Sequence, residues 1–152
     1  MKWITRERPK IDRIACPWLI ARFIDKEPEF LFVKANDVLP LSRKHGAIPY
    51  DIEGVELSHD GPLCSFDAFL KKYELNAPGL AELAVIVRGA DTDHHDLAPE
   101  CAGLFAISLG LSQLYKNDYE QLAQGFIIYN ALFAWLNKAR GESHNWNPQK
   151  AS

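Results

Sequence analysis

Apolar residues recur at the spacing of an α-helix along most of the chain. Pro78 and Pro99 suit the first turns of two such segments, because the N–H that proline lacks is not needed there. Pro17 interrupts the first segment, and since an internal proline removes a backbone donor, we expect a kink or a fresh helix that starts at Pro17. Gly89 is placed to end the third segment. The pattern predicts helices over five ranges: 9–27, 66–75, 78–88, 99–115 and 118–139.

Three shorter segments, 2–7, 29–35 and 47–52, have strand length and are rich in aromatic and β-branched residues. Pro49 is typical of an edge strand, where a missing backbone donor costs little. Between the second and third strands, residues 36–46 predict one or two helical turns ending at a glycine. We therefore expect an α+β fold: a mainly helical single domain of about five helices with a small β-sheet of two to three short strands.

The length of 152 residues fits one domain, which we place at 1–140, followed by a polar C-terminal tail at 141–152 that should fray. A net charge of −3 argues against a broad grip on nucleic acid, so we expect no direct nucleic acid binding. The charged N-terminus lacks the apolar core of a signal peptide, and no apolar run has the length of a membrane span. These features predict a cytoplasmic protein that does not bind membranes.

The three cysteines form no CxxC pair, and their odd count favours free thiols. If a helix restarts at Pro17, Cys16 lies at its N-terminal end, where the helix dipole lowers a thiol pKa. Cys16 would then be a nucleophile, a reductant or a soft metal ligand. The alternative is a small buried side chain beside a kink, with Asp12 and Arg13 paired to other charges.

A second group of reactive side chains lies in one turn-rich stretch: His59, Asp60, Cys64 and Asp67. Imidazole, thiolate and carboxylate together suit zinc or iron. Their spacing matches no strong metal signature. A loop histidine followed by a helix cap, with Ser65 as the capping residue, explains the stretch equally well.

The segment "GADTDHHDL" contains three aspartates and two adjacent histidines. Asp91 follows Arg88 and a helix-ending glycine, where backbone donors or the guanidinium would hold its carboxylate. His94 and His95 point to different sides of an extended loop, so we do not expect them to grip one ion. A solvated loop is the interpretation we favour for this histidine pair.

Two further patterns suggest binding surfaces. A basic group comprises Arg6, Arg8, Lys10 and Arg13. Several of its charges would share one face of an extended strand and cradle a tetrahedral oxyanion, although a plain solvated strand edge gives the same pattern.

Small residues, Ala102, Ala106 and Gly110, share one helix face and allow close approach of a neighbouring helix. That neighbour would belong either to the same chain or to another copy in a homo-oligomer.

Two long phrases, "KIDRIACPWLI" and "IVRGADT", occur with the shorter "FLFVKANDV", "GAIPYDIEGVELSH" and "CSFDAFL". Together they resemble the C-terminal domain of ChrB-type chromate-resistance proteins, a family also labelled chromate-resistance exported protein. The resemblance runs from about Trp3 to Trp135 and does not include His94 or His95. The additional N-terminal region of full-length ChrB proteins has no counterpart here. The matched motif residues are Asp12, Arg13, Cys16, Pro17, Trp18, Asp51, His59, Cys64, Asp67, Arg88, Gly89 and Asp91.

The resemblance implies a role in chromate resistance, as a sensor, regulator or accessory enzyme. A pocket that unites Asp12, His59 and Asp91 would suit a transition metal ion, Fe, Mn or Zn, with positions open for substrate. The first hypothesis is therefore a metal-binding enzyme or redox accessory protein. The second is a non-enzymatic module that senses chromate or another small oxyanion, and the third is direct reduction of chromate by Cys16 and Cys64.

These hypotheses assign roles to specific side chains. The catalytic candidates are Asp12, Arg13 and Cys16. The candidate metal ligands are His59, Cys64 and Asp91. The candidate oxyanion-binding residues are Arg6, Arg13 and Arg88.

Overall fold

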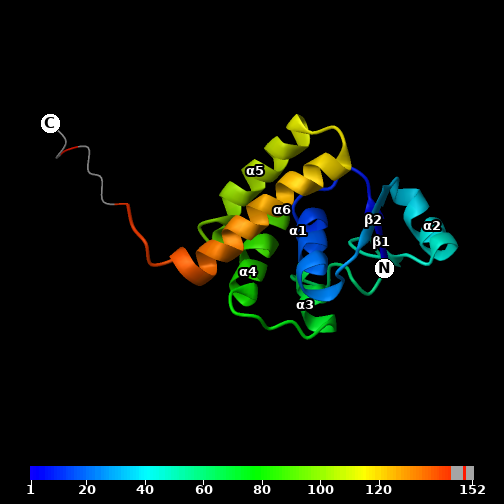
Figure 1. Cartoon of the computed structure of the whole chain (residues 1–152), viewed down its shortest axis with the longest axis horizontal. Helices are drawn as coiled ribbons and strands as arrows, with labels where there is room; N and C mark the ends of the chain where they lie inside the picture. The colour runs from blue at the N-terminus through cyan, green and yellow to red at the C-terminus, as the bar shows by residue number, and fades with distance from the viewer. Residues whose placement is uncertain (145–148, 150–152) are drawn as a thin grey trace.

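The computed structural model describes residues 1–144 and 149, so most of the predicted tail at 141–152 lies outside the described residues. The strands are β1 (Lys2–Arg6), β2 (Glu29–Val33) and β3 (Ile48–Pro49). The α-helices are α1 (Asp12–Leu19), α2 (Val38–His45), α3 (Ser65–Lys72), α4 (Leu80–Asp91), α5 (Cys101–Leu114) and α6 (Asp118–Ala134). This arrangement, mainly helical with one small sheet, confirms the predicted α+β class (Figure 1).

The three strands form one parallel sheet in the order β2-β1-β3. In the central strand, the side chains of Trp3 and Ile4 are both fully buried but belong to different clusters. Ile4 packs with Val38 of α2, whereas Trp3 packs with the main helical core. Successive side chains of a strand point to opposite faces, so the sheet is covered on both sides. Pro49 lies on an edge strand, as its sequence context predicts.

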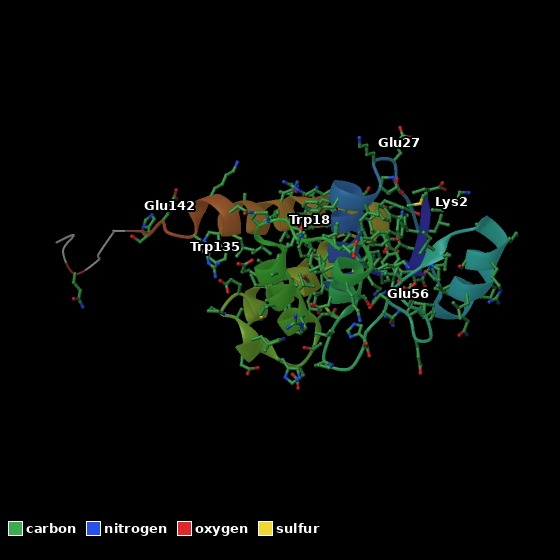
Figure 2. The ribbon with its side chains drawn as sticks, turned by 90° about the horizontal axis from the view of Figure 1, so that it is seen from below. Lys2, Trp18, Glu27, Glu56, Trp135 and Glu142 are labelled. Atoms are coloured by element: carbon green, nitrogen blue, oxygen red, sulfur yellow. The ribbon has the colours of Figure 1, made fainter. Side chains whose placement is uncertain are left out.

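Helix α1 is the centre of the helical part and packs against α3, α4 and α6 (Figure 1). Trp18 of α1 is buried in this core, with its ring against Tyr129 and Phe133 of α6. Figure 2 shows Trp18 in the densely packed middle of the molecule. Gly125 of α6 allows the helices to approach closely, because a Cβ there would lie 2.4 Å from Cγ2 of Ile14. The first turn of α1 is therefore held firmly inside the fold.

Of the two alternatives that the sequence left at Pro17, a kink or a fresh helix, the fresh helix is wrong. Helix α1 begins at Asp12 and continues through Pro17, and a π-helical stretch, Ile20–Ile24, follows it directly. The chain turns into the helix at Ile11, which has a φ of 45° and whose carbonyl accepts the first helical hydrogen bonds. Burial of almost every side chain in α1 outweighs the cost of an internal proline, which is about 3 kcal/mol.

Two predicted helix boundaries are also wrong. Gly89 does not end α4, which continues to Asp91 and is closed by Thr92, whose hydroxyl donates to the Arg88 carbonyl at 2.7 Å. Gly89 serves packing instead, because a Cβ there would lie 2.3 Å from Sγ of Cys101 in α5. Helix α3 is capped by Cys64 rather than by Ser65: the Cys64 backbone N–H donates to the Asp67 carboxylate.

Short helical turns complete the fold, at Ala35–Asp37, His95–Leu97 and Trp135–Ala139. Helix α2 ends at Gly46 in the left-handed conformation, as predicted. Among the described residues, no helix combines the length and the apolar character that crossing a membrane requires.

Candidate metal centre

Asp12 lies at the start of α1 with its carboxylate fully buried against the start of α3. The backbone N–H groups of Ser65 and Phe66 donate to its two oxygens at 2.7 and 3.0 Å. These N–H groups belong to the first turn of α3, which has no carbonyls of its own to bond them, and the helix dipole favours an anion there. Asp12 is therefore fixed in position by a second helix.

Asp51 follows β3 in the left-handed conformation, with a φ of 50°. One of its oxygens accepts a hydrogen bond from the Ser65 hydroxyl at 2.7 Å. The other oxygen is 3.0 Å from Nη2 of Arg6 and 3.4 Å from Nε of Arg13. The strand end, the two arginines and α3 together hold this carboxylate beside that of Asp12.

His59 joins these carboxylates to Asp91, the last residue of α4. Its Nε2 lies 3.0 Å from Asp91, 3.3 Å from Asp51 and 3.5 Å from Asp12, measured to the nearest carboxylate oxygen. The loop that carries His59 is pinned by the Asp51 backbone N–H, which donates to the Leu57 carbonyl at 2.8 Å. We call Asp12, Asp51, His59 and Asp91 the Asp–His cluster.

The cluster concentrates three carboxylates around one imidazole. The pKa of His59 is raised to about 10, first by its hydrogen bonds to Asp51 and Asp91. Burial raises the pKa of Asp12, and the charges of Asp91 and Asp51 raise it further. Burial also raises the pKa of Asp91, although His59 opposes this effect. The cluster thus supplies several ligand atoms for a cation. The proton on His59 is the positive charge that a bound cation would replace.

Asp51 behaves differently from the other two carboxylates. Burial opposes its ionisation, but the hydrogen bonds from His59 and Ser65 and the charges of Arg13 and Arg6 outweigh it and lower its pKa. Asp51 is therefore the carboxylate most firmly held in its ionised form.

Ligand atoms of Asp12, His59 and Asp91 all lie within 4.8 Å of one another. Such a set, with one imidazole nitrogen and carboxylate oxygens, suits Mn, Fe or Zn. The side chain of His59 is 41% exposed, whereas that of Asp12 is fully buried, so the cluster opens to solvent on the His59 side.

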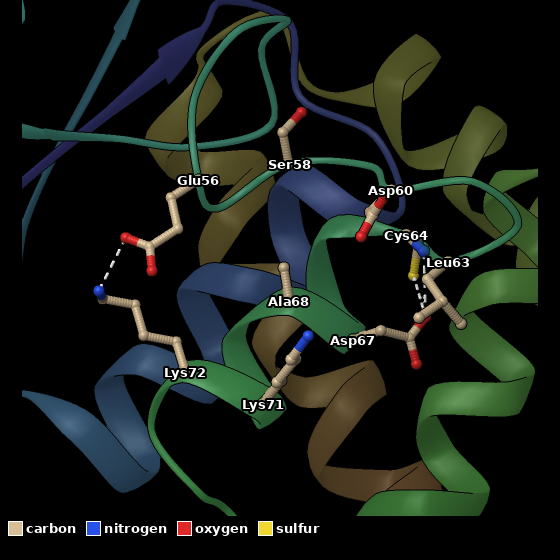
Figure 3. Close-up of a pocket in the computed structure, with 9 residues that line it drawn as sticks. All are labelled: Glu56, Ser58, Asp60, Leu63, Cys64, Asp67, Ala68, Lys71 and Lys72. Carbon is tan, nitrogen blue, oxygen red and sulfur yellow. Dashed lines mark hydrogen bonds and ion pairs between the residues drawn. The ribbon is translucent and has the colours of Figure 1, made fainter.

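Two hollows flank the loop that carries His59, and Ser58 lines both. One, of about 300 Å³, has Arg6, Asp51 and His59 in its wall and so adjoins the Asp–His cluster. The other, of about 500 Å³, lies over α3 (Figure 3). In Figure 3, Lys72 is paired with Glu56 on one side of this hollow, and Cys64 and Asp67 bond to each other on the other side.

Comparison with known proteins places the chain. The family described as "ChrB, C-terminal domain" matches residues 3–136. The chain belongs to the ChrB C-terminal domain family. It is also 29% identical over 140 residues to "Protein ChrB" of Cupriavidus metallidurans, an alignment that covers 91% of this chain and 42% of that protein. The chain thus spans less than half of that relative. No solved structure matches.

In this ChrB C-terminal domain, Cys16 is not at a helix N-terminus, contrary to the sequence prediction. It lies one turn into α1, fully buried, and its thiol donates to Asp12 Oδ1 at 3.3 Å. Burial raises the pKa of Cys16, and the charge of Asp12 raises it further. The sequence predicted Cys16 at a helix N-terminus, where its thiolate would be stabilised. This position does not form, because α1 begins at Asp12, four residues before Cys16.

Cys64 is buried at the start of α3, beside Asp67 rather than within the Asp–His cluster. Its thiol donates to Asp67 Oδ2 at 3.3 Å, and burial raises its pKa well above the usual range. All three cysteines of the chain, the third being Cys101, are free and buried. None of them offers an exposed thiolate.

The basic candidates are held by partners within the domain. Arg6 and Arg13 both bind Asp51, and Arg88 forms a two-point pair with Asp67 at 2.8 and 2.9 Å. Arg8 lies away from the cluster, where its guanidinium donates to three carbonyls at the end of α5 and its Nη1 contacts Asp118 of α6 at 3.0 Å.

His94 and His95 lie outside the Asp–His cluster. His94 is exposed, and the ring of His95 packs against that of Phe105 with centroids 4.8 Å apart. Sequence reasoning gave Asp51 no role as a ligand, although the family resemblance covered it. The predicted strand 47–52 contains Asp51, so its place in the sequence gave no local sign of a ligand.

Proposed function

We propose that this domain serves chromate resistance as a metal-binding domain. The ion would be held by His59 and Asp91, with Asp12 as third ligand and Asp51 as the neighbouring carboxylate. The observation that carries the proposal is the convergence of three carboxylates on His59 Nε2, all at 3.0 to 3.5 Å. Buried like charges this close are costly unless a cation offsets them, and a metal ion would replace the His59 proton in this role.

The local architecture supports a metal more than a simple ion pair. Asp12 and Asp51 are already oriented by α3 and by the arginines, as second partners orient metal ligands in proteins generally. Within the described residues, the Asp91 carboxylate has the fewest bonds of the three, with only the weak 3.4 Å contact from the Asp12 N–H besides His59. Asp91 and His59 therefore have the freedom to rearrange around an ion.

A bound ion would supply Lewis acidity and an attraction for anions at the hollow beside His59. Chromate or another small oxyanion would reach the ion from this side, where the side chain of Arg6 is 42% exposed. Asp12 is too deeply buried to meet a substrate directly, so its role would be to hold the ion. This arrangement would serve either an enzyme or a redox accessory protein.

The alternative, an oxyanion sensor that works through arginines alone, has less support. Each of Arg6, Arg13 and Arg88 is already paired with an aspartate, and those pairs would have to break to bind chromate. Three carboxylates near Arg6 and Arg13 would also repel a divalent anion. The metal proposal removes this difficulty, because the ion reverses the sign of the local charge.

The test is metal analysis of protein purified without a histidine tag, followed by calorimetric titration with Mn²⁺, Fe²⁺ and Zn²⁺. We expect about one equivalent of one of these metals per chain. His59→Ala and Asp91→Asn should each weaken binding at least about 100-fold, because a first-row metal loses one of its few protein ligands.

The matched control is His94→Ala, which removes an exposed imidazole outside the cluster. It should bind metal as the parent does. Less than about a tenth of an equivalent in every titration, or equal binding by the parent and His59→Ala, would refute the proposal. Saturable chromate binding by the metal-free protein that Arg6→Ala abolishes would favour the sensor instead.

A further inference from the structure

Helix α5 has an unusual surface for a helix at the edge of a domain. None of its fourteen residues is charged. Its outer side exposes Phe105 (36%), Ile107 (51%), Leu109 (37%) and Leu114 (76%). A helix that is apolar all round is normally buried on all sides, yet within the described residues α5 makes its main contacts with α4, α6 and the short turn before it (Figure 1).

The buried stripe of α5 is narrow and consists of Cys101, Leu104, Ser108 and Ser112. With 3.6 residues per turn, the centre of the opposite side falls at Ala106. Ala102 and Gly110, one turn away on either side, are also exposed, and no atom lies within 4 Å of a Cβ built at Gly110. The neighbour that this small-residue face predicts is therefore not found within the described part of the chain.

We propose that the outer face of α5 binds the same helix of a second copy, antiparallel, about a two-fold axis near Ala106. The charge pattern selects this occupant. A two-fold axis brings each side chain near its own copy, so a self-pairing face must avoid repelling charges. A face without any charge over four turns meets this condition, whereas surfaces for other soluble partners usually use charge for specificity.

The side-chain sizes on α5 also fit its own copy. An antiparallel pair centred on Ala106 brings Leu109 of one copy over Gly103 of the other, and Ala102 over Gly110. The large Leu109 thus meets a small residue, and the row of small residues lets the backbones approach. Phe105 and Ile107 lie on opposite flanks of the row, so each would lie beside its own copy.

The available area predicts a reversible dimer. Half the surface of a helix about 21 Å long and about 11 Å wide is roughly 350 Å². Ile127 of α6, 61% exposed, adds to the apolar surface of the neighbouring helix. The sum falls somewhat short of about 500 Å² per partner, the lower limit for stable specific interfaces. We therefore expect association that depends on protein concentration.

Sedimentation velocity over a concentration series tests this with the full chain. The parent protein should shift from monomer to dimer, and Ala106→Glu should raise the dimer dissociation constant at least about 100-fold, because the two-fold opposes like charges. Ala106 is exposed, so the variant should keep its helical circular dichroism. Leu39→Glu is the matched control: it charges another exposed apolar residue (37%), on the distant helix α2, and should leave the dimer intact.

A cross-linking variant tests the position of the axis. Ala106→Cys should form an intermolecular disulfide on mild oxidation, because the axis places the two new thiols together and the three native cysteines are buried. Leu39→Cys should not. A parent protein that stays monomeric throughout the series, a dimer unaffected by Ala106→Glu, or a dimeric Ala106→Cys that does not cross-link would overturn the proposal. Metal binding plays no part in these readouts.

Discussion

The reactivity of Cys16 depends on where its helix begins. A helix starting at Pro17 would have given Cys16 a lowered pKa, but α1 begins at Asp12, and burial instead raises the pKa of the thiol. The adjacent Asp12 carboxylate strengthens this effect, because a thiolate beside it would be repelled. A reductant needs an accessible thiolate, so the structure disfavours direct reduction of chromate by Cys16.

Thiol labelling measures this directly. We expect Cys16, Cys64 and Cys101 to react with a disulfide reagent at least about 100-fold more slowly in the folded protein than in denaturant, since all three are buried. The number and rate of reacting thiols are followed by absorbance. One fast thiol in the folded protein, lost in Cys16→Ser or Cys64→Ser, would restore the thiol-reduction hypothesis.

Gly89 is a second residue whose role in the structure differs from the role that its sequence context predicts. A Cβ there would lie 2.3 Å from Sγ of Cys101 and 2.8 Å from the His94 carbonyl. We predict that Gly89→Ala lowers the free energy of unfolding by about 1–3 kcal/mol, because the α4–α5 contact must open. Urea denaturation of the variant gives this value.

The control for this prediction is Glu82→Ala, an exposed change on the same helix, which should alter stability by less than about 0.5 kcal/mol. If Gly89→Ala were as stable as the parent, Gly89 would not be required for the contact. The glycine in the phrase IVRGADT would then have some role other than close packing of α4 against α5.

At the scale of elements, α3 and α4 are joined by the Asp67–Arg88 pair, whose side chains are 11% and 23% exposed. Burial opposes ionisation of Asp67, but the hydrogen bonds from Arg88 and from the Cys64 backbone outweigh it and lower its pKa. The ionised carboxylate therefore stabilises the fold fully above its unfolded pKa of about 3.9. This stabilisation is lost as the pH falls from there through the folded pKa.

We predict that Asp67→Asn lowers the free energy of unfolding by about 1–3 kcal/mol at pH 7, and that the difference from the parent shrinks below about pH 4. Denaturation at a series of pH values measures both. Glu56→Gln is the control, because Glu56 is 70% exposed and its solvent-screened pair with Lys72 should contribute little to stability. A difference that does not vary with pH would exclude the ion pair as its source.

The elements themselves were largely predictable, because hydrophobic spacing depends on local sequence and on which side of an element is buried. The strands at β1 and β2 and helices α5 and α6 follow this spacing closely. The errors lie where contacts between elements decide. Pro17 stays inside α1 because the helix is packed on several sides, and Gly89 was read as a local stop although its role is to admit Cys101.

At the scale of the whole molecule, the Asp–His cluster draws its side chains from α1, the end of β3, the loop before α3 and the end of α4. The sequence and the family resemblance suggested Asp12, His59 and Asp91 as one pocket, and their side chains do lie together. No local pattern indicated that Asp51 belongs with them. Its position depends on Arg6, Arg13 and Ser65, which are 14 to 45 residues away in sequence.

Because the ligands come from four segments, an ion bound to the folded protein should couple to the stability of the whole domain. Ligand at about 100 times its dissociation constant stabilises a protein by about 2.7 kcal/mol when the unfolded chain does not bind it. For a domain of this size that corresponds to a rise in Tm of roughly 5–10 °C. Scanning calorimetry with and without the metal selected by titration measures the rise.

Removing one ligand should uncouple the ion from the fold. His59→Ala should abolish the rise in Tm, whereas His45→Ala, which changes a histidine on α2 outside the cluster, should keep it. His59→Ala also removes the imidazole from among three carboxylates, which changes the stability of the protein without any metal. The Tm of the metal-free variant is therefore measured separately. An equal rise in Tm in the parent and in His59→Ala would mean that the ion binds elsewhere. A rise in Tm in the parent and His45→Ala but not in His59→Ala would tie the stability of the domain to the Asp–His cluster.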